Sequence, residues 1–127
     1  MKHEYLCLSF FILPLLVSCG GDDSGTSDKK LESDIAYVSG KIDELTTDLT
    51  CDTNEQCLYI EYGHKPCGGP AGFRIYSSKN TDVILINEYA DDYFQLTMEY
   101  NERHGLVSDC SVEMPPAVHC EIECKQS

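Results

Sequence analysis

The sequence lacks tryptophan and has few basic side chains, with 9 lysines and arginines against 22 aspartates and glutamates. The formal charge of −13 argues against a nucleic-acid ligand, whose phosphates need a basic surface, and against a polybasic membrane-surface patch. Recognisable metalloprotease, serine-hydrolase and phosphate-loop motifs are also missing. We therefore expect no enzyme, and we assign no catalytic residue, cofactor or metal.

An apolar segment near the N-terminus, residues 5–17, follows a weakly charged start and is interrupted by Pro14. It is shorter than the roughly 20 residues of a membrane-spanning helix and fits the hydrophobic part of an export signal. The segment runs into LVSC at residues 16–19, which resembles the lipobox of bacterial lipoproteins. That resemblance implies that residues 1–18 are a signal peptide and that Cys19 carries a diacylglycerol, with cleavage just before this cysteine.

A lipidated Cys19 would anchor the protein to the membrane of the bacterial cell envelope, because each buried CH2 group contributes about 0.8 kcal/mol. Gly20 favours the outer membrane, since lipoproteins kept at the inner membrane tend to have aspartate there; the face of the membrane stays open. Residues 19–34 are mostly glycine, serine, aspartate and lysine. This composition predicts a lipidated flexible tether, followed by a disulfide-rich domain over residues 35–127.

The domain is predicted to be α+β, with a long amphipathic helix packed on a short antiparallel sheet. Apolar residues spaced three and four apart predict a helix over 35–49, with a strand as the alternative. A longer helix is predicted over 82–104, with Thr81 as N-cap and Gly105 after the last turn. Alternating apolar residues predict strands over 56–63, 73–78, 106–113 and 117–124.

Of the 8 cysteines, Cys7 leaves with the signal and Cys19 takes the lipid. An even number remains in a small exported domain, which predicts three disulfides. Antiparallel pairing of 56–63 with 117–124 favours a nested set, and the alternative exchanges the two outer partners. The nested set is Cys51–Cys124, Cys57–Cys120 and Cys67–Cys110; the alternative has Cys51–Cys120 and Cys57–Cys124. Zinc is not expected, because only one pair of cysteines has the close spacing of zinc ligands.

The segment KPCGGP at residues 65–70, with Tyr76-Ser77 and later Ser108-Asp109-Cys110, resembles a family of small exported bacterial domains with a Cys-Gly-Gly-Pro motif. The resemblance covers residues 51–124 and implies one compact disulfide-linked domain, without implying an activity. Glycines permit a sharp turn here. The turn is either a structural corner or a preorganised contact loop, similar to the reactive loops of protease inhibitors. The contact loop would display His64, Lys65, Gly68 and Gly69.

Acidic residues form the predicted outer face of the helix over 82–104. They are Glu88, Asp91, Asp92, Glu99 and Glu102. This face either steers a basic protein partner or only keeps the domain soluble. We interpret the chain as a lipid-anchored, non-enzymatic protein-binding module, with an inhibitor or immunity role against a basic partner. The alternatives are a structural accessory lipoprotein of an envelope assembly and, less favoured, a hydrolase.

Overall fold

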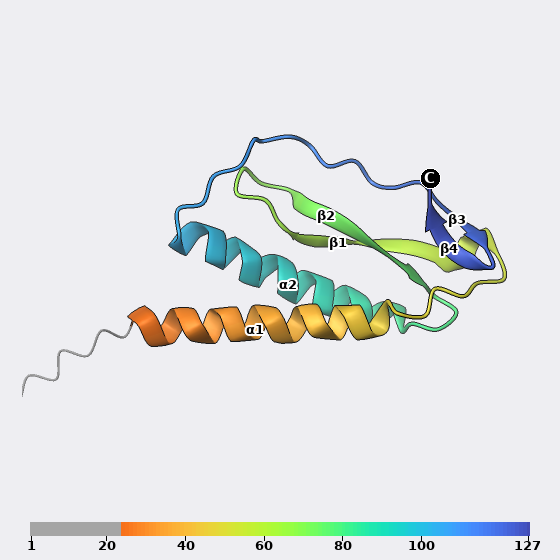
Figure 1. Ribbon diagram of the computed structural model, residues 1–127, viewed down its shortest axis with the longest axis horizontal. Helices are drawn as coiled ribbons and strands as arrows, with labels where there is room; N and C mark the ends of the chain where they lie inside the picture. The colour runs from red at the N-terminus through yellow and green to blue at the C-terminus, as the bar shows by residue number, and fades with distance from the viewer. Residues whose placement is uncertain (1–23) are drawn as a thin grey trace, which may run out of the picture.

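The computed structural model describes residues 24–127, which form two long helices, a short 3₁₀ helix and two β-hairpins (Figure 1). The predicted signal peptide, the lipobox cysteine and the first tether residues lie outside the described residues. The α+β class is confirmed. In chain order the elements are α1 (Ser24–Leu45), η1 (Asn54–Gln56), β1 (Cys57–His64), β2 (Pro70–Ser77), α2 (Val83–Arg103), β3 (Val118–Glu121) and β4 (Glu123–Gln126).

Helices α1 and α2 run antiparallel, side by side, and together cover one side of the β1–β2 hairpin (Figure 1). All four elements contribute buried side chains to one core, whose members are Val38, Ile42, Ile60, Tyr76, Ile86 and Ala90. Partly buried tyrosines and leucines of β1 and α2 extend this core. A two-stranded hairpin is marginal by itself, so burial against the two helices supplies the stability that its own ladder lacks.

The β1–β2 turn has the sharp geometry that its glycines predict. Gly68 and Gly69 have φ values of +101° and +78°, a region that side chains disfavour. The Lys65 amide donates to the Gly69 carbonyl (2.9 Å), and the Gly68 amide donates to the Lys65 carbonyl (2.8 Å). β2 begins directly at Pro70, earlier than the predicted start of the second strand at residue 73.

Helix α1 begins at Ser24, so the prediction of a flexible tether is wrong for residues 24–34. Leu31 in this stretch is only 5% exposed. Arg103 at the end of α2 donates to the Ser27 hydroxyl (2.7 Å) and lies 3.3 Å from an Asp28 carboxylate oxygen. One buried leucine and a polar contact from a residue far along the chain thus hold a segment whose composition indicates no core.

The end of α1 and the start of α2 are joined by a threonine that we predicted as an N-cap. Thr81 is buried and donates its hydroxyl proton to the Leu45 carbonyl (2.6 Å). The N-cap is instead Asp82, whose carboxylate accepts from the amides of Ile84 and Leu85 (2.9 and 3.0 Å). At the other end of α2, Gly105 has a φ of +57°, as its predicted position requires.

The predicted strand over 106–113 is absent. Residues 106–117 form an irregular segment, here called the strap, that runs from the end of α2 past the β1–β2 turn to β3 (Figure 1). Its backbone is turned at Cys110, which has a φ of +57°, and such a turn is incompatible with a continuous strand.

The single strand predicted over 117–124 is also wrong, because the chain reverses at Ile122 to form the β3–β4 hairpin. Ile122 has a φ of +75°, an uncommon backbone conformation for a β-branched residue. β3 and β4 therefore pair with each other, and neither forms the predicted ladder with β1.

This reversal decides the disulfide pairing. Cys120 and Cys124 are direct cross-strand neighbours, and each reaches a different element. The disulfides are Cys51–Cys120, Cys57–Cys124 and Cys67–Cys110. The nested pairing that we favoured for the outer two is thus wrong, since it required residues 117–124 to run as one strand along β1; the alternative set is the observed one.

The shared core predicts that Ile42→Ala lowers the free energy of unfolding by about 2–5 kcal/mol, because the side chain is fully buried between helices and hairpin. The matched control is Ile84→Ala, also in a helix but 74% exposed, which should cost less than about 0.5 kcal/mol. Urea unfolding of the oxidised protein measures both. Equal losses would contradict the core as described.

Candidate functional site

The acidic face of α2, as predicted from the sequence, is solvent-exposed at all five of its positions: Glu88, Asp91, Asp92, Glu99 and Glu102. Glu99 forms an ion pair with Arg103 one turn later. Within residues 24–127 the other four carboxylates have no ion pair. The face therefore presents uncompensated negative charge to the solvent.

Most basic side chains of the described chain already lie beside a carboxylate. The pairs are Lys30–Asp34, Lys41–Glu44, Lys65–Glu113, Arg74–Asp43, Lys79–Asp52, Arg103–Glu99 and Lys125–Glu121. Exposed pairs of this kind add little stability, but they neutralise the cations locally. The excess negative charge is consequently concentrated on carboxylates that have no such partner, and the acidic face of α2 is one place where several of them gather.

A hollow of about 360 Å³ borders this face, between α2 and β1. Glu61 of β1 and Asp91 of α2 both line it, together with the aromatic ring of Phe94. The amide side chains of Asn87 and Gln95 complete its polar wall. Two carboxylates beside an aromatic ring suit the ammonium or guanidinium group of a lysine or arginine side chain. Glu61 could not be recognised as a site residue from the sequence, because only the fold brings this strand residue next to the helix.

The predicted contact loop does not display its two charged or titratable residues. Lys65 is only 13% exposed at its side chain, and its ammonium donates to the Ser111 carbonyl and hydroxyl (both 2.7 Å) and to Glu113 (3.2 Å). The His64 ring packs edge-on against Phe94, with 4.8 Å between ring centroids. Lys65 is therefore engaged within the domain and His64 is partly buried, and of the four predicted contact residues only Gly68 and Gly69 are exposed.

The strap is fastened to the β1–β2 turn by Lys65 and by the Cys67–Cys110 disulfide. Asp109 lies 3.6 Å from the Lys65 ammonium and accepts from the Ser111 amide and hydroxyl (3.1 and 2.9 Å). The hydrogen bonds from Ser111, and then the positive charge of Lys65, lower the pKa of the Asp109 carboxyl below its ordinary value. An extended segment without its own ladder is thus held by charge-assisted contacts and one covalent bond.

A groove of about 440 Å³ opens between α1, α2 and the turn end of the β1–β2 hairpin. Its walls are mostly apolar and include the rings of Tyr62, Tyr93 and Tyr100, with Ile35 and Ala71. Tyr62 and Tyr93 lie 4.5 Å apart between ring centroids, and the Tyr62 hydroxyl is hydrogen-bonded to Ser39 (2.8 Å). The groove could not be predicted from the sequence, because the first helix was expected to begin after Glu32, which also lines it.

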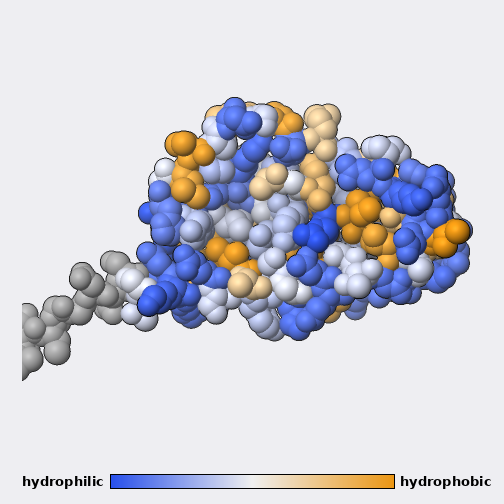
Figure 2. All heavy atoms as spheres, viewed as in Figure 1, coloured by the Kyte–Doolittle hydropathy of each residue, from blue (hydrophilic) through white to orange (hydrophobic). Residues whose placement is uncertain are grey.

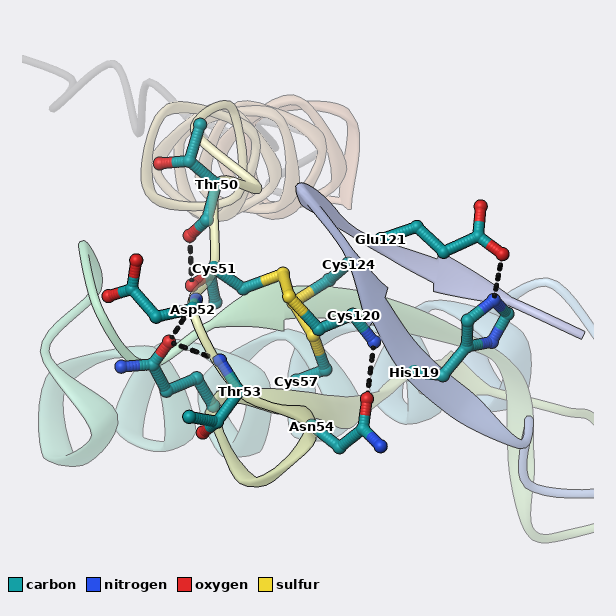
Figure 3. The surroundings of a disulfide bond; sticks show 12 residues. Thr50, Cys51, Asp52, Thr53, Asn54, Cys57, His119, Cys120, Glu121 and Cys124 are labelled. Atoms are coloured by element: carbon teal, nitrogen blue, oxygen red, sulfur yellow. Dashed lines mark hydrogen bonds and ion pairs between the residues drawn. A yellow bond between two sulfur atoms is a disulfide. The ribbon is translucent and has the colours of Figure 1, made fainter.

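The two buried disulfides lie next to each other where η1, β1 and the β3–β4 hairpin meet (Figure 3). The sulfur atoms of Cys51, Cys57 and Cys124 are within 4.8 Å of one another, a spacing that thiolates around a metal ion could also have. All three sulfurs are used in disulfides here, so the cluster serves as a cross-link. Asn54 supports it by accepting from the Cys120 amide at 2.9 Å.

The chain matches no protein family, no curated protein and no solved structure. Within the described residues, neither helix combines the length and the hydropathy needed to cross a membrane.

The difference in disulfide exposure predicts an order of reduction. Both cysteines of Cys67–Cys110 are exposed, whereas Cys51, Cys57 and Cys124 are buried. Because thiol attack needs access to sulfur, brief treatment with a mild thiol followed by alkylation should label Cys67 and Cys110 first. Peptide mass spectrometry reads the labelled sites, and far-UV circular dichroism should stay unchanged at this stage. Earlier labelling of Cys51 or Cys57 would contradict the assigned burial.

Burial, and secondly the neighbouring Tyr62, raise the pKa of Tyr93 to about 12. An unfolded tyrosine ionises near pH 10, so above this pH the folded state retains a proton that the unfolded state loses. The free energy of unfolding should therefore fall between about pH 10 and 12, and Tyr93→Phe should make this fall shallower. Denaturant titrations across this range measure the slope. Tyr37→Phe, at a residue 61% exposed, is the control and should keep the original slope; an unchanged slope in Tyr93→Phe would refute the assignment.

Proposed function

We propose that this protein is a lipid-anchored, non-enzymatic binding module of the bacterial cell envelope that recognises a basic protein. The observation that carries the proposal is the exposed acidic face of α2 together with the adjoining hollow, which is lined by Glu61, Asp91 and Phe94. A flat array of carboxylates attracts any cation, whereas a hollow with two carboxylates and a ring also has a shape that one basic side chain can fill.

The anchor rests on the sequence LVSC at residues 16–19, with Cys19 as the lipidated residue. Three disulfides support an oxidising compartment outside the cytoplasm, as expected for an exported protein. The outer membrane is the proposed location, because the residue after Cys19 is Gly20 and not the aspartate that favours retention at the inner membrane.

Electrostatic steering explains how such a module would work. Uncompensated negative charge accelerates encounters with a basic protein and orients it before contact, and salt weakens the effect. Three disulfides cross-link the domain, so binding would require little ordering of its backbone. An inhibitor of a basic hydrolase or an immunity protein against a basic toxin would both use a surface of this kind.

The proposal predicts a salt-dependent partner. A C-terminally tagged, detergent-solubilised lipoprotein should capture a basic protein from envelope and culture supernatant at about 0.1 M salt, where the Debye length is about 10 Å, and release it at about 1 M. The double substitution Glu61→Gln and Asp91→Asn should then weaken the affinity of the captured protein about tenfold at low salt, because both charges facing its basic side chain are removed.

The matched control removes the same charge elsewhere. Glu55→Gln with Glu123→Gln neutralises two exposed carboxylates away from α2 and should leave the affinity within about twofold. Equal weakening of the affinity by both double substitutions would mean that binding depends only on the net charge of the protein and not on the hollow. Capture that is indifferent to salt and to Glu61 and Asp91 would refute the basic-partner proposal and favour the structural accessory role.

A further inference from the structure

Large apolar side chains are exposed along the strap. Val107 is 91% exposed, Val112 83%, Met114 75% and Leu106 46%. Figure 2 shows orange, hydrophobic surface along the upper left rim of the molecule, where the strap passes over the end of α2 and the β1–β2 turn. The strap is attached to the β1–β2 turn through Cys110 and Lys65, and these side chains lie outside the core.

The strap begins at Leu106, directly after the last turn of α2, and this end of the domain is also where α1 starts (Figure 1). The contacts of Arg103 with Ser27 and Asp28 join the last turn of α2 to the first turns of α1. The Leu106 amide donates to the Asn101 carbonyl (3.0 Å), which keeps Leu106 beside that last turn. The β3–β4 hairpin and the first turn of α2 lie at the opposite end (Figure 1).

The length of chain before α1 decides what can reach this end. Cys19 is five residues before Ser24. At about 3.3–3.6 Å per residue this spacer spans at most about 18 Å. The 22 residues of α1 are about 33 Å long at 1.5 Å per residue, so the domain is longer than its spacer. A lipid on Cys19 therefore keeps the end that carries Leu106 and Val107 next to the bilayer.

We propose that Leu106 and Val107 rest in the interface of the membrane to which Cys19 is anchored, and so orient the domain on the lipid surface; this inference rests on the proposed lipid anchor. The contact is small, but the anchor gives it a high effective concentration, so an interaction too weak to recruit a free domain suffices to orient a tethered one. Glu102 and Asp109 are exposed nearby, which makes a zwitterionic surface a better match than an anionic one.

The absence of tryptophan gives a direct test, because Val107→Trp creates a chain with a single tryptophan, whose emission can be excited apart from that of the tyrosines. The full lipoprotein is reconstituted into phosphatidylcholine vesicles with or without lipids brominated near the headgroup end of the acyl chains. Trp emission at position 107 should fall by about half with brominated lipid, since interfacial side chains lie at this depth. The matched control, Ile84→Trp, is 74% exposed at the opposite end and should keep its emission.

The outcomes separate the contact from the anchor. Protein that floats with vesicles while Trp emission at position 107 is unquenched overturns the contact alone, as does equal quenching at positions 107 and 84. Emission at position 107 that is shielded from aqueous quencher and is also unquenched by brominated lipid indicates a protein partner or a second copy, and also overturns it. Protein that fails to float, or a Cys19→Ser variant that floats equally well, overturns the anchor and this inference with it.

Discussion

The two adjacent buried disulfides, Cys51–Cys120 and Cys57–Cys124, are the constraint on which the C-terminal part of the domain depends. β3 and β4 have four residues each, too few for a hairpin that is stable by itself. Both of its strands are covalently attached, one to the loop after α1 and one to β1. The uncommon backbone conformation of Ile122 at its tip is tolerated under this double attachment, and the Ile122 carbonyl accepts from the Cys51 amide at 2.9 Å.

Fixing the β3–β4 hairpin also fixes the end of the strap that leads into it. This attachment affects the path of the strap as far as the end of α2. The strap continues into β3 at one side and out of α2 at the other, and Cys110 holds its middle to the β1–β2 turn. A free segment of this length would fold its apolar residues onto the nearest hydrophobic surface. Held at three places, it leaves Val107 and Val112 in solvent. Lys65 completes the attachment from the turn, which is why a residue that the sequence suggests as a contact is internal.

The sequence predicted those elements whose signals are local. The α2 helix was expected over 82–104 and spans Val83–Arg103, and β1 follows its alternating apolar pattern. The start of α1 could not be predicted, because its first turns are held by Arg103, far along the chain. The disulfide pairing followed from a reversal at Ile122, where no glycine, asparagine or proline marks a turn. The hollow beside α2 was missed for a similar reason: Glu61 and Asp91 are brought together only by packing.

The cross-links also explain how so small a domain carries its charge. The formal charge of −13 on the whole chain falls largely within this domain and opposes compaction through self-repulsion, and the basic side chains relieve it only where they are paired. Disulfides restrict the unfolded chain, so the folded state tolerates repulsion that would destabilise an unlinked domain of this size. Carboxylates such as Asp91 and Asp92 can then remain unpaired in solvent. In the proposed orientation on the membrane, α2 runs away from the lipid surface, and these carboxylates stay accessible to a partner arriving from the aqueous side.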